Sequence, residues 1–160
     1  MIDNGVEVLL YSPKDFRNVC VIARTLEVFG IHRCYVYDPN DLIRPSYGKR
    51  YSRKLRKISS GAFFLVDFIK VDDPLEFIGR YKKRTIATVL GNKKQVFLDK
   101  FRFVKSDLLI FGSEATGIPD DLVKICDKRL LIRQFGKTQS LNLGMAVGIV
   151  LYEAVKQIKS

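Results

Sequence analysis

The sequence predicts an α/β fold in which a mostly parallel sheet is flanked by helices, within a single domain over residues 1–160. Short apolar runs alternate with segments of helical periodicity along the chain, which is the pattern of strand–helix–strand units. The length fits one domain. A composition of 47% hydrophobic and 28% charged residues is that of a folded globular protein.

The first half of the chain contains three expected strands and one clear helix. Val6–Tyr11 is an apolar run that stops at a Ser-Pro pair, so we expect a strand. Apolar residues at helical spacing predict a helix over Arg17–Gly30, which the glycine ends. Cys34–Tyr37 is the second strand, a basic segment follows as a loop or short irregular helix, and Ala62–Val66 is the third strand.

The second half continues the alternation. Proline in a first turn predicts a helix that opens at Asp73-Pro74 and runs to about Lys82. Gln95–Phe101 fits no single class. The remaining elements are expected as strand Thr85–Leu90, strand Asp107–Phe111, helix Pro119–Ile125, strand Arg129–Gln134 and helix Ser140–Ile158. This last helix is apolar on nearly all sides at its start, so it must be covered on more than one side, in the core or at a subunit interface.

The charge of the chain favours an anionic partner. Lys and Arg number 28 against 17 Asp and Glu, a net charge of +11, and the pI is about 9.7. Bases without intervening acids, interleaved with tyrosines, suit phosphate contacts and base stacking, although a solvated loop is an equally good interpretation. The candidate RNA-binding residues are Arg44, Lys49, Arg50, Arg53, Lys54, Arg56 and Lys57. A second group at Arg80–Arg84 sits at an expected helix end, where cations are favoured in any case.

Several classes of protein and site are disfavoured. The longest apolar run is too short for a bilayer span, and the N-terminus lacks a signal-peptide pattern, so we expect a cytoplasmic protein without membrane partners. Three widely spaced cysteines without a CxxC predict buried core residues and neither disulfides nor a metal site. His32 is the single histidine, expected in a structural or surface role, and no GxSxG elbow accompanies it.

Polar residues and glycines follow the expected strands, where parallel sheets collect ligands. The loop after Asp107–Phe111 holds Gly112, Glu114 and Gly117, and it lacks both the Walker A and the GxGxxG pattern. Its glycines suggest a tight turn or a close approach to a ligand, and Glu114 can bind a hydroxyl-bearing ligand or fix a neighbouring loop. Ser140 fits a helix N-cap, whereas Asn142 in an apolar first turn needs a polar partner.

Three segments taken together are more specific than any one of them. They are Asn18–Thr25 with Arg24, then Phe111–Gly117 with Glu114, then Gln134–Asn142 with Gly136 and Ser140-Leu141-Asn142. In order, approximate spacing and position, they resemble the three motifs of the SpoU/TrmH family, RNA ribose 2′-O-methyltransferases of the SPOUT class. The resemblance extends over nearly the whole chain.

The resemblance implies a C-terminal deep trefoil knot in the sheet, S-adenosylmethionine (AdoMet) as the cofactor and a homodimer. The cofactor-binding positions it implies are Leu90, Gly91, Phe111, Gly112, Gly117, Leu131, Ile132, Gln134, Ser140 and Leu141. No metal is implied. The chain departs from the family pattern at Arg133, Gly144 and Ala115-Thr116, which bears on cofactor affinity and removes no expected catalytic side chain.

The same resemblance implies catalytic positions at Asn18, Arg24, Glu114, Ser140 and Asn142. The family proposal makes the arginine a base for the ribose hydroxyl, but a guanidinium stays protonated in proteins. We therefore favour phosphate clamping and ribose orientation over a transient proton transfer. Transfer RNA is the favoured substrate, ribosomal RNA and a catalytically idle RNA-binding protein are the alternatives, and DNA is excluded because it lacks the 2′-OH.

Overall fold

The structure is a computed structural model that describes residues 5–43, 49–91 and 94–159. A seven-stranded sheet in the order β3-β2-β1-β6-β4-β7-β5 forms its centre, and each of its strand pairs is parallel. The predicted fold class is therefore confirmed. The strands are β1 (Val6–Tyr11), β2 (Arg33–Tyr37), β3 (Asp67–Lys70), β4 (Thr85–Thr88), β5 (Val96–Phe97), β6 (Asp107–Phe111) and β7 (Lys128–Leu131).

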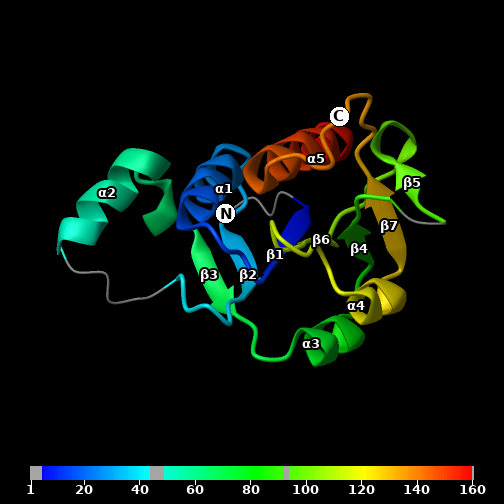
Figure 1. Ribbon diagram of the computed structural model, residues 1–160, viewed down its shortest axis with the longest axis horizontal. Helices are drawn as coiled ribbons and strands as arrows, with labels where there is room; N and C mark the ends of the chain where they lie inside the picture. Colours follow the sequence, from blue (N-terminus) through cyan, green and yellow to red (C-terminus); the bar gives the residue numbers. More distant parts are fainter. Residues whose placement is uncertain (1–4, 44–48, 92–93, 160) are drawn as a thin grey trace.

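Helices cover both faces of the sheet (Figure 1). On one face α1 packs against α5 and α2, and on the other α3 packs against α4. The helices are α1 (Phe16–Val28), α2 (Lys49–Ser59), α3 (Pro74–Arg80), α4 (Asp120–Ile125) and α5 (Leu143–Lys159), with 3-10 turns η1 (Ala62–Phe64) and η2 (Leu98–Lys100). Among the described residues no helix has the length and apolar character needed to cross a membrane.

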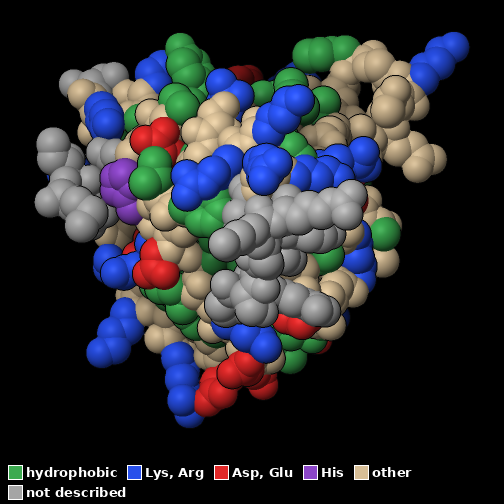
Figure 2. Space-filling view, turned by 90° about the vertical axis from the view of Figure 1, so that its left-hand side faces the viewer, with side chains coloured by type: hydrophobic (Ala, Val, Ile, Leu, Met, Phe, Trp, Pro, Cys, Tyr) green, Lys and Arg blue, Asp and Glu red, His purple; other side chains and the backbone are tan. Residues whose placement is uncertain are grey.

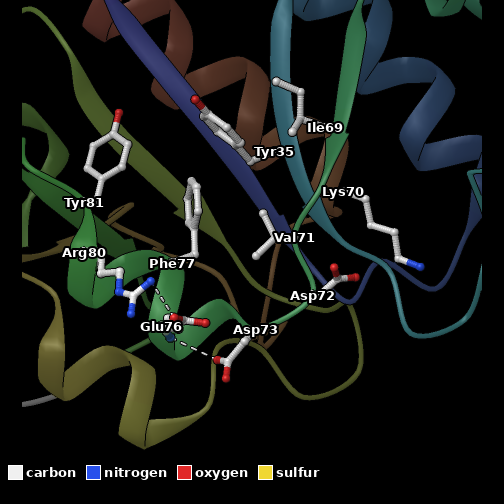
Figure 3. Close-up of a pocket in the computed structure, with 10 residues that line it drawn as sticks. All are labelled: Tyr35, Ile69, Lys70, Val71, Asp72, Asp73, Glu76, Phe77, Arg80 and Tyr81. Atoms are coloured by element: carbon white, nitrogen blue, oxygen red, sulfur yellow. Dashed lines mark hydrogen bonds and ion pairs between the residues drawn. The ribbon is translucent and has the colours of Figure 1, made fainter.

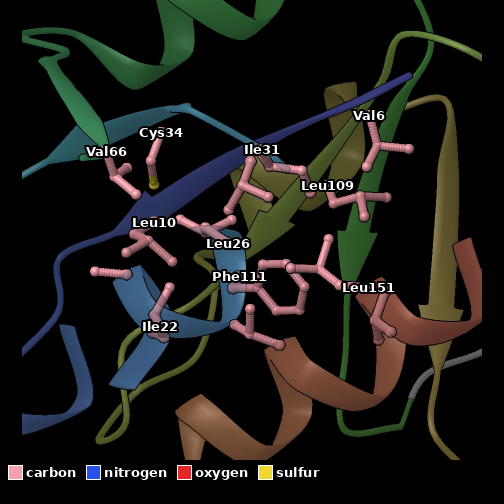
Figure 4. Packing of buried hydrophobic residues seen from close by; sticks show 14 of the residues in the cluster. Val6, Leu10, Ile22, Leu26, Ile31, Cys34, Val66, Leu109, Phe111 and Leu151 are labelled. Atoms are coloured by element: carbon pink, nitrogen blue, oxygen red, sulfur yellow. The ribbon is translucent and has the colours of Figure 1, made fainter. Parts of the chain in front are cut away.

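The sheet is buried on both faces, as parallel sheets generally are. β6 is buried along its whole length, and the side chains of β1 and β6 alternate between two apolar clusters. Leu10, Leu109 and Phe111 pack with Ile22 and Leu151 of α1 and α5 (Figure 4), and the other cluster joins the sheet to α3 and α4. Cys20, Cys34 and Cys126 are free and buried, which confirms the predicted core role.

The expected elements hold with three corrections. Ala62–Val66 is wrong as a strand, because its first residues form η1 and the strand follows at Asp67–Lys70; an apolar run of this length does not distinguish a buried turn from a strand. Of the two alternatives for the basic segment, a loop or a short irregular helix, the structure has an eleven-residue helix, Lys49–Ser59. The predicted strand Arg129–Gln134 is displaced to Lys128–Leu131, and the last helix begins at Leu143 rather than Ser140.

The strand order brings distant segments to one edge. The chain moves outward from β1 to β2 and β3, then crosses to the other half of the sheet, and β6 finally pairs beside β1. This makes the β1–β6 boundary a topological switch point, where ligands collect outside the carboxyl ends of strands. The loop that leaves β1, together with the first turn of α1, carries Lys14–Asn18, and the loop that leaves β6 carries Gly112–Glu114.

Candidate functional site

Three polar side chains from the three motif segments form one hydrogen-bonded chain at the switch point. Asn18 Nδ2 donates to Glu114 Oε1 at 2.8 Å, and Asn142 Nδ2 donates to Asn18 Oδ1 at 2.9 Å. The partners lie 96 and 124 residues apart in sequence. The structure thus brings together three of the five predicted catalytic residues.

Glu114 fixes the loop after β1, which was one of the two roles the sequence left open. Its Oε2 accepts the backbone N–H of Lys14 at 2.9 Å, and its Oε1 accepts that of Asp15 at 3.2 Å. Asp15 in turn caps α1 by accepting the N–H of Arg17. One carboxylate therefore sets where α1 begins and how Asn18 is presented.

These hydrogen bonds also govern the charge of Glu114. Partial burial raises the pKa of its carboxyl, but the hydrogen bonds from Asn18 and from the backbone, including Lys14 and Asp15, outweigh burial and hold the pKa below its ordinary value. Glu114 is consequently an anion at neutral pH that accepts hydrogen bonds. It has no proton to give at that pH.

Asn142 is the N-cap of α5, where the sequence placed Ser140. Asn142 Oδ1 accepts the N–H groups of Gly144 and Met145 at 2.9 and 3.3 Å, as an N-cap side chain does. The N-cap prediction for Ser140 is therefore wrong, because the helix starts later. Ser140 is exposed, and its side chain has no hydrogen bond within the described residues.

Arg24 lies on the exposed side of α1 and is not part of the three-residue hydrogen-bonded chain. It belongs to an exposed stripe at helical spacing with Arg17, Val21 and Val28. Within the described part of the chain its side chain has no hydrogen bond or ion pair. The guanidinium is thus available to a partner outside the described residues, such as a phosphate.

The loop after β6 is a tight turn closed on itself. Ser113 and Gly117 exchange backbone hydrogen bonds of 3.1 and 2.8 Å, and Gly117 has a φ of +68°. A Cβ on Gly112 would stand 2.2 Å from the carbonyl carbon of Gly117. Both glycines are therefore needed by the turn itself.

An apolar cavity opens beyond the ends of β4 and β7. Its volume is about 320 Å³, the lower end of the range for small-molecule sites. The lining residues are Leu90, Phe97, Leu131, Ile132, Arg133, Gln134 and Phe135. Four predicted cofactor residues meet here, namely Leu90, Leu131, Ile132 and Gln134.

The other predicted cofactor residues do not line this cavity. The Phe111 side chain is buried in the core, and Gly112 and Gly117 form the turn described above. Gly91 follows Leu90 and is exposed, with open space around its Cα. Ser140 and Leu141 are exposed on the segment that leads into α5.

Three lining residues, Phe97, Arg133 and Phe135, were not among the individually predicted cofactor residues, although the departure from the family pattern at Arg133 was expected to bear on cofactor affinity. Arg133 stacks over the Phe97 ring, 3.8 Å from its centroid, and lies 3.6 Å from Asp99. It is thereby held at the cavity wall, at a position where the family pattern has another residue. Phe135 is 90% exposed; an aromatic residue beside Gly136 in a motif segment was the signal that could have found it.

The basic helix α2 forms an exposed face of the molecule. Arg53, Lys54, Arg56 and Lys57 are exposed, and Lys and Arg side chains gather across this face (Figure 2). Of the other predicted RNA-binding residues, Arg44 lies outside the described residues, and Lys49 and Arg50 belong to α2. In the second basic group, Arg80 pairs with Glu76 and Arg84 pairs with Asp107, so both have structural partners.

A larger cavity on the opposite face of the sheet is lined by none of the predicted catalytic, cofactor-binding or RNA-binding residues. It measures about 480 Å³ between β2, β3 and α3, with Tyr35, Phe77 and Tyr81 as aromatic walls (Figure 3). Arg80 pairs with Glu76, and Asp73 caps α3. Lys70 and Asp72 are its other charged lining residues.

The cysteine thiols and metal chemistry add no alternative site. Burial raises the pKa of Cys20 and of Cys126 to about 11, so neither is a ready nucleophile. Among the described residues, no group of three or more His, Cys, Asp or Glu side chains could hold a metal ion. His32 is exposed.

The model of the family described as "SpoU rRNA Methylase family" matches residues 5–152. The chain belongs to this family. Among its relatives, the tRNA (guanosine(18)-2'-O)-methyltransferase of Aquifex aeolicus is 32% identical over 149 residues, 91% of this chain and 66% of that protein. The 23S rRNA (guanosine-2'-O-)-methyltransferase RlmB of Acinetobacter baylyi is 30% identical over 159 residues, 97% of this chain and 61% of the relative.

Solved structures share the fold. The A. aeolicus TrmH/SpoU tRNA modifying enzyme superposes with a TM-score of 0.81 at 29% identity, covering 96% of this chain and 75% of that one. A structure described as giving insights into 2-OH methylation of C/U34 on tRNA gives 0.80 at 27% identity, covering 96% and 97%. This chain spans less than two thirds of the length of the curated relatives named above.

Proposed function

We propose that the protein transfers a methyl group from AdoMet to a ribose 2′-OH in RNA, with transfer RNA as the favoured substrate. The observation that carries this proposal is the Glu114–Asn18–Asn142 hydrogen-bonded chain. It joins the three motif segments at the switch point of a sheet whose family and fold are those of RNA methyltransferases.

The cavity beside β7 suits the cofactor. Leu90, Leu131 and Ile132 provide apolar walls for a flat adenine, and the amide of Gln134 provides hydrogen bonds. One structural relative at 23% identity, an rRNA methyltransferase from Sinorhizobium meliloti, is described as AdoMet-bound. When bound, AdoMet supplies an activated methyl group with a good leaving group. The deep knot that the resemblance implies around this site stays a prediction.

The residues of the chain position the hydroxyl. Glu114 fixes Asn18, and Asn18 and Asn142 present amide groups that can hold the ribose. Arg24 stays cationic, so its role is to clamp the phosphate next to the target ribose and stabilise the developing oxyanion. Ser140 lies two residues before Asn142 on an exposed segment, from which its hydroxyl can contact a bound substrate.

The substrate class follows from charge and from the relatives. The exposed bases of α2 supply phosphate contacts, and the A. aeolicus relative acts on transfer RNA. Ribosomal RNA is the second candidate, because the RlmB relative at similar identity acts on 23S rRNA.

We also propose a homodimer built on α1 and α5. Apolar side chains on the outer side of this helix pair are exposed, among them Val21 at 42%, Met145 at 59% and Tyr152 at 60%. The helices are close, since a Cβ on Gly144 would stand 3.1 Å from Val21. Arg24 lies in the same stripe, so pairing these faces brings it to the subunit boundary. Met145→Glu should give a monomer in sedimentation velocity, whereas a wild-type monomer contradicts the dimer.

The function is tested by incubating the protein with methyl-labelled AdoMet and, separately, total tRNA and rRNA. We expect label in the tRNA pool and its loss in Arg24→Ala. Label in rRNA alone selects the second candidate. Cofactor binding without label in either pool, measured by calorimetry, contradicts the proposed activity and favours a binding protein.

A further inference from the structure

A second cavity lies on the carboxyl edge of the sheet, between the ends of β2 and β3 and the turn η1. Its volume is about 370 Å³, and its walls are mainly apolar, with Ile43, Phe63, Val66 and Phe68 among them. It is on the same side of the sheet as α1, since Phe63 and Val66 pack in the cluster that contains α1. It shares no lining residue with the proposed cofactor cavity.

The polar lining residues of this cavity are Asp38, Asp41 and Lys70, and Asp38 directly follows β2. Asp38 is 7% exposed and is a lining residue. Its Oδ2 accepts the N–H of Ile43 at 2.8 Å, whereas its buried Oδ1 has no hydrogen-bond partner among the described residues. A buried acceptor without a donor is costly. A ligand that brings an N–H group into the cavity removes that cost.

Aromatic rings connect the cavity to the basic helix α2. The rings of Phe68 and Phe63 lie 5.1 Å apart in the wall, and Phe64 follows at 5.7 Å. Phe64 is 46% exposed, and the Arg56 guanidinium lies 4.8 Å from its ring centroid. Aromatic faces beside cations are the means by which proteins hold unpaired bases of single strands.

The negative charge of Asp38 and the positive charge of α2 together indicate which class of ligand the cavity accepts. An inorganic phosphate fits the basic face of α2 but not the carboxyl of Asp38, and a lysine side chain fits Asp38 but not the basic face. A nucleotide meets both requirements, because its phosphate is anionic and its base carries N–H donors. The apolar walls suit the faces of a flat ring.

We propose that this cavity binds an unpaired base of the substrate RNA that carries an exocyclic amino group, which donates to Asp38 Oδ1. An amino group projects beyond the ring and reaches an acceptor in a pocket wall, as in carboxylate contacts to cytosine N4. The ring N–H of uracil lies between two carbonyl oxygens, which would face the carboxyl. The cavity is therefore a specificity pocket that disfavours uracil. The inference rests on the proposed function in taking RNA as the ligand.

The pocket serves a nucleotide that flanks the methylated one. β2 and β6 are separated by β1, so their ends lie about 10 Å apart at ordinary strand spacing. The loop after β1 bridges the two sites, because Lys14 bonds to Glu114 through its N–H and to Asn40 through Nζ. An RNA chain that places one ribose at Asn18 can thus place the base of a neighbouring nucleotide at Asp38.

The test measures binding of fluorescein-labelled cytidine and uridine homopolymers to the whole chain by anisotropy. We expect wild type to prefer cytidine by about fivefold, the effect of one hydrogen bond. In Asp38→Asn the side-chain amide oxygen still accepts the hydrogen bond from the Ile43 N–H. The amide nitrogen, which is a donor, then takes the place of the carboxylate oxygen Oδ1, which is an acceptor. The preference should then disappear or reverse. Asp67→Asn, an exposed charge-matched change on β3, should retain it.

Equal affinity of wild type for both polymers, or an unchanged preference in Asp38→Asn, overturns the proposal. Ile43→Phe, which fills the cavity and keeps Asp38, must also abolish the preference. Movement of the Ile43 amide NMR signal with the cytidine polymer supports the pocket, and movement with free cytidine monophosphate to the same extent shows a mononucleotide site instead. None of these measurements depends on methyl transfer. The base pocket can therefore be confirmed or refuted separately from the proposed methyltransferase activity.

Discussion

Asn142 has two roles that a pair of substitutions can separate. Its Oδ1 caps α5 through Gly144 and Met145, and its Nδ2 donates to Asn18. Asn142→Ala removes both, so it should cost about 1 kcal/mol of unfolding free energy, the usual value of an N-cap, and lower Tm by about 2–4 °C at this chain length. Asn142→Asp keeps a good cap next to the positive end of the helix dipole, but it replaces the donor with an oxygen that faces Asn18 Oδ1.

The aspartate variant should therefore unfold within about 0.5 kcal/mol of wild type and still lose methyl transfer. A loss of about tenfold or more is expected, since 1.4 kcal/mol of positioning corresponds to that factor. Urea denaturation gives the stability, and initial rates at saturating RNA and AdoMet give the activity. Full activity in Asn142→Asp would refute the reasoning, because it would show that the Asn142–Asn18 hydrogen bond does not organise the site.

Three further outcomes follow from the same contacts. The pKa of Glu114 is lower in the folded than in the unfolded protein. Its carboxylate therefore stabilises the fold above the unfolded carboxyl pKa of about 4.3, and this stabilisation is lost as pH falls through the folded pKa. In Glu114→Gln, the free energy of unfolding measured by urea titration should fall less steeply with acidification. Asp107→Asn breaks the buried bidentate pair with Arg84 and should cost about 3 kcal/mol by chemical denaturation. Gly112→Ala, with its Cβ 2.2 Å from Gly117, should lower Tm, whereas Gly79→Ala, which meets nothing within 4 Å, should not.

The sequence predicted the parts of the molecule that depend on local pattern. The buried strand Asp107–Phe111 and the helix after it follow from apolar runs and a proline, and both are confirmed. The need of Asn142 for a partner was visible because it interrupts an apolar turn, and the partner is Asn18. The resemblance supplied the cavity, since Leu90 and Gln134 are far apart in sequence and meet only through the strand order.

Other features depend on tertiary contacts, which the spacing of apolar residues in the sequence does not predict. Ala62 and Phe63 fill the core from a 3-10 turn, which looks like a strand in sequence. Two neighbouring polar residues compete to cap α5, and the hydrogen bonds of Asn142 decide against Ser140. Asp38 is the first residue of an ordinary turn signal, Asp-Pro-Asn, so its buried oxygen without a hydrogen-bond partner becomes visible only when β2, β3 and η1 pack together.

The most direct test of the central claim is the chemical position of the transferred methyl. After reaction with methyl-labelled AdoMet and tRNA, the RNA is hydrolysed in alkali, which cleaves every linkage next to a free 2′-OH. We predict label in an alkali-resistant dinucleotide that yields one 2′-O-methyl nucleoside on digestion, and none with Arg24→Ala. Label released as an alkali-labile mononucleotide, with the methyl on the base, would contradict the account.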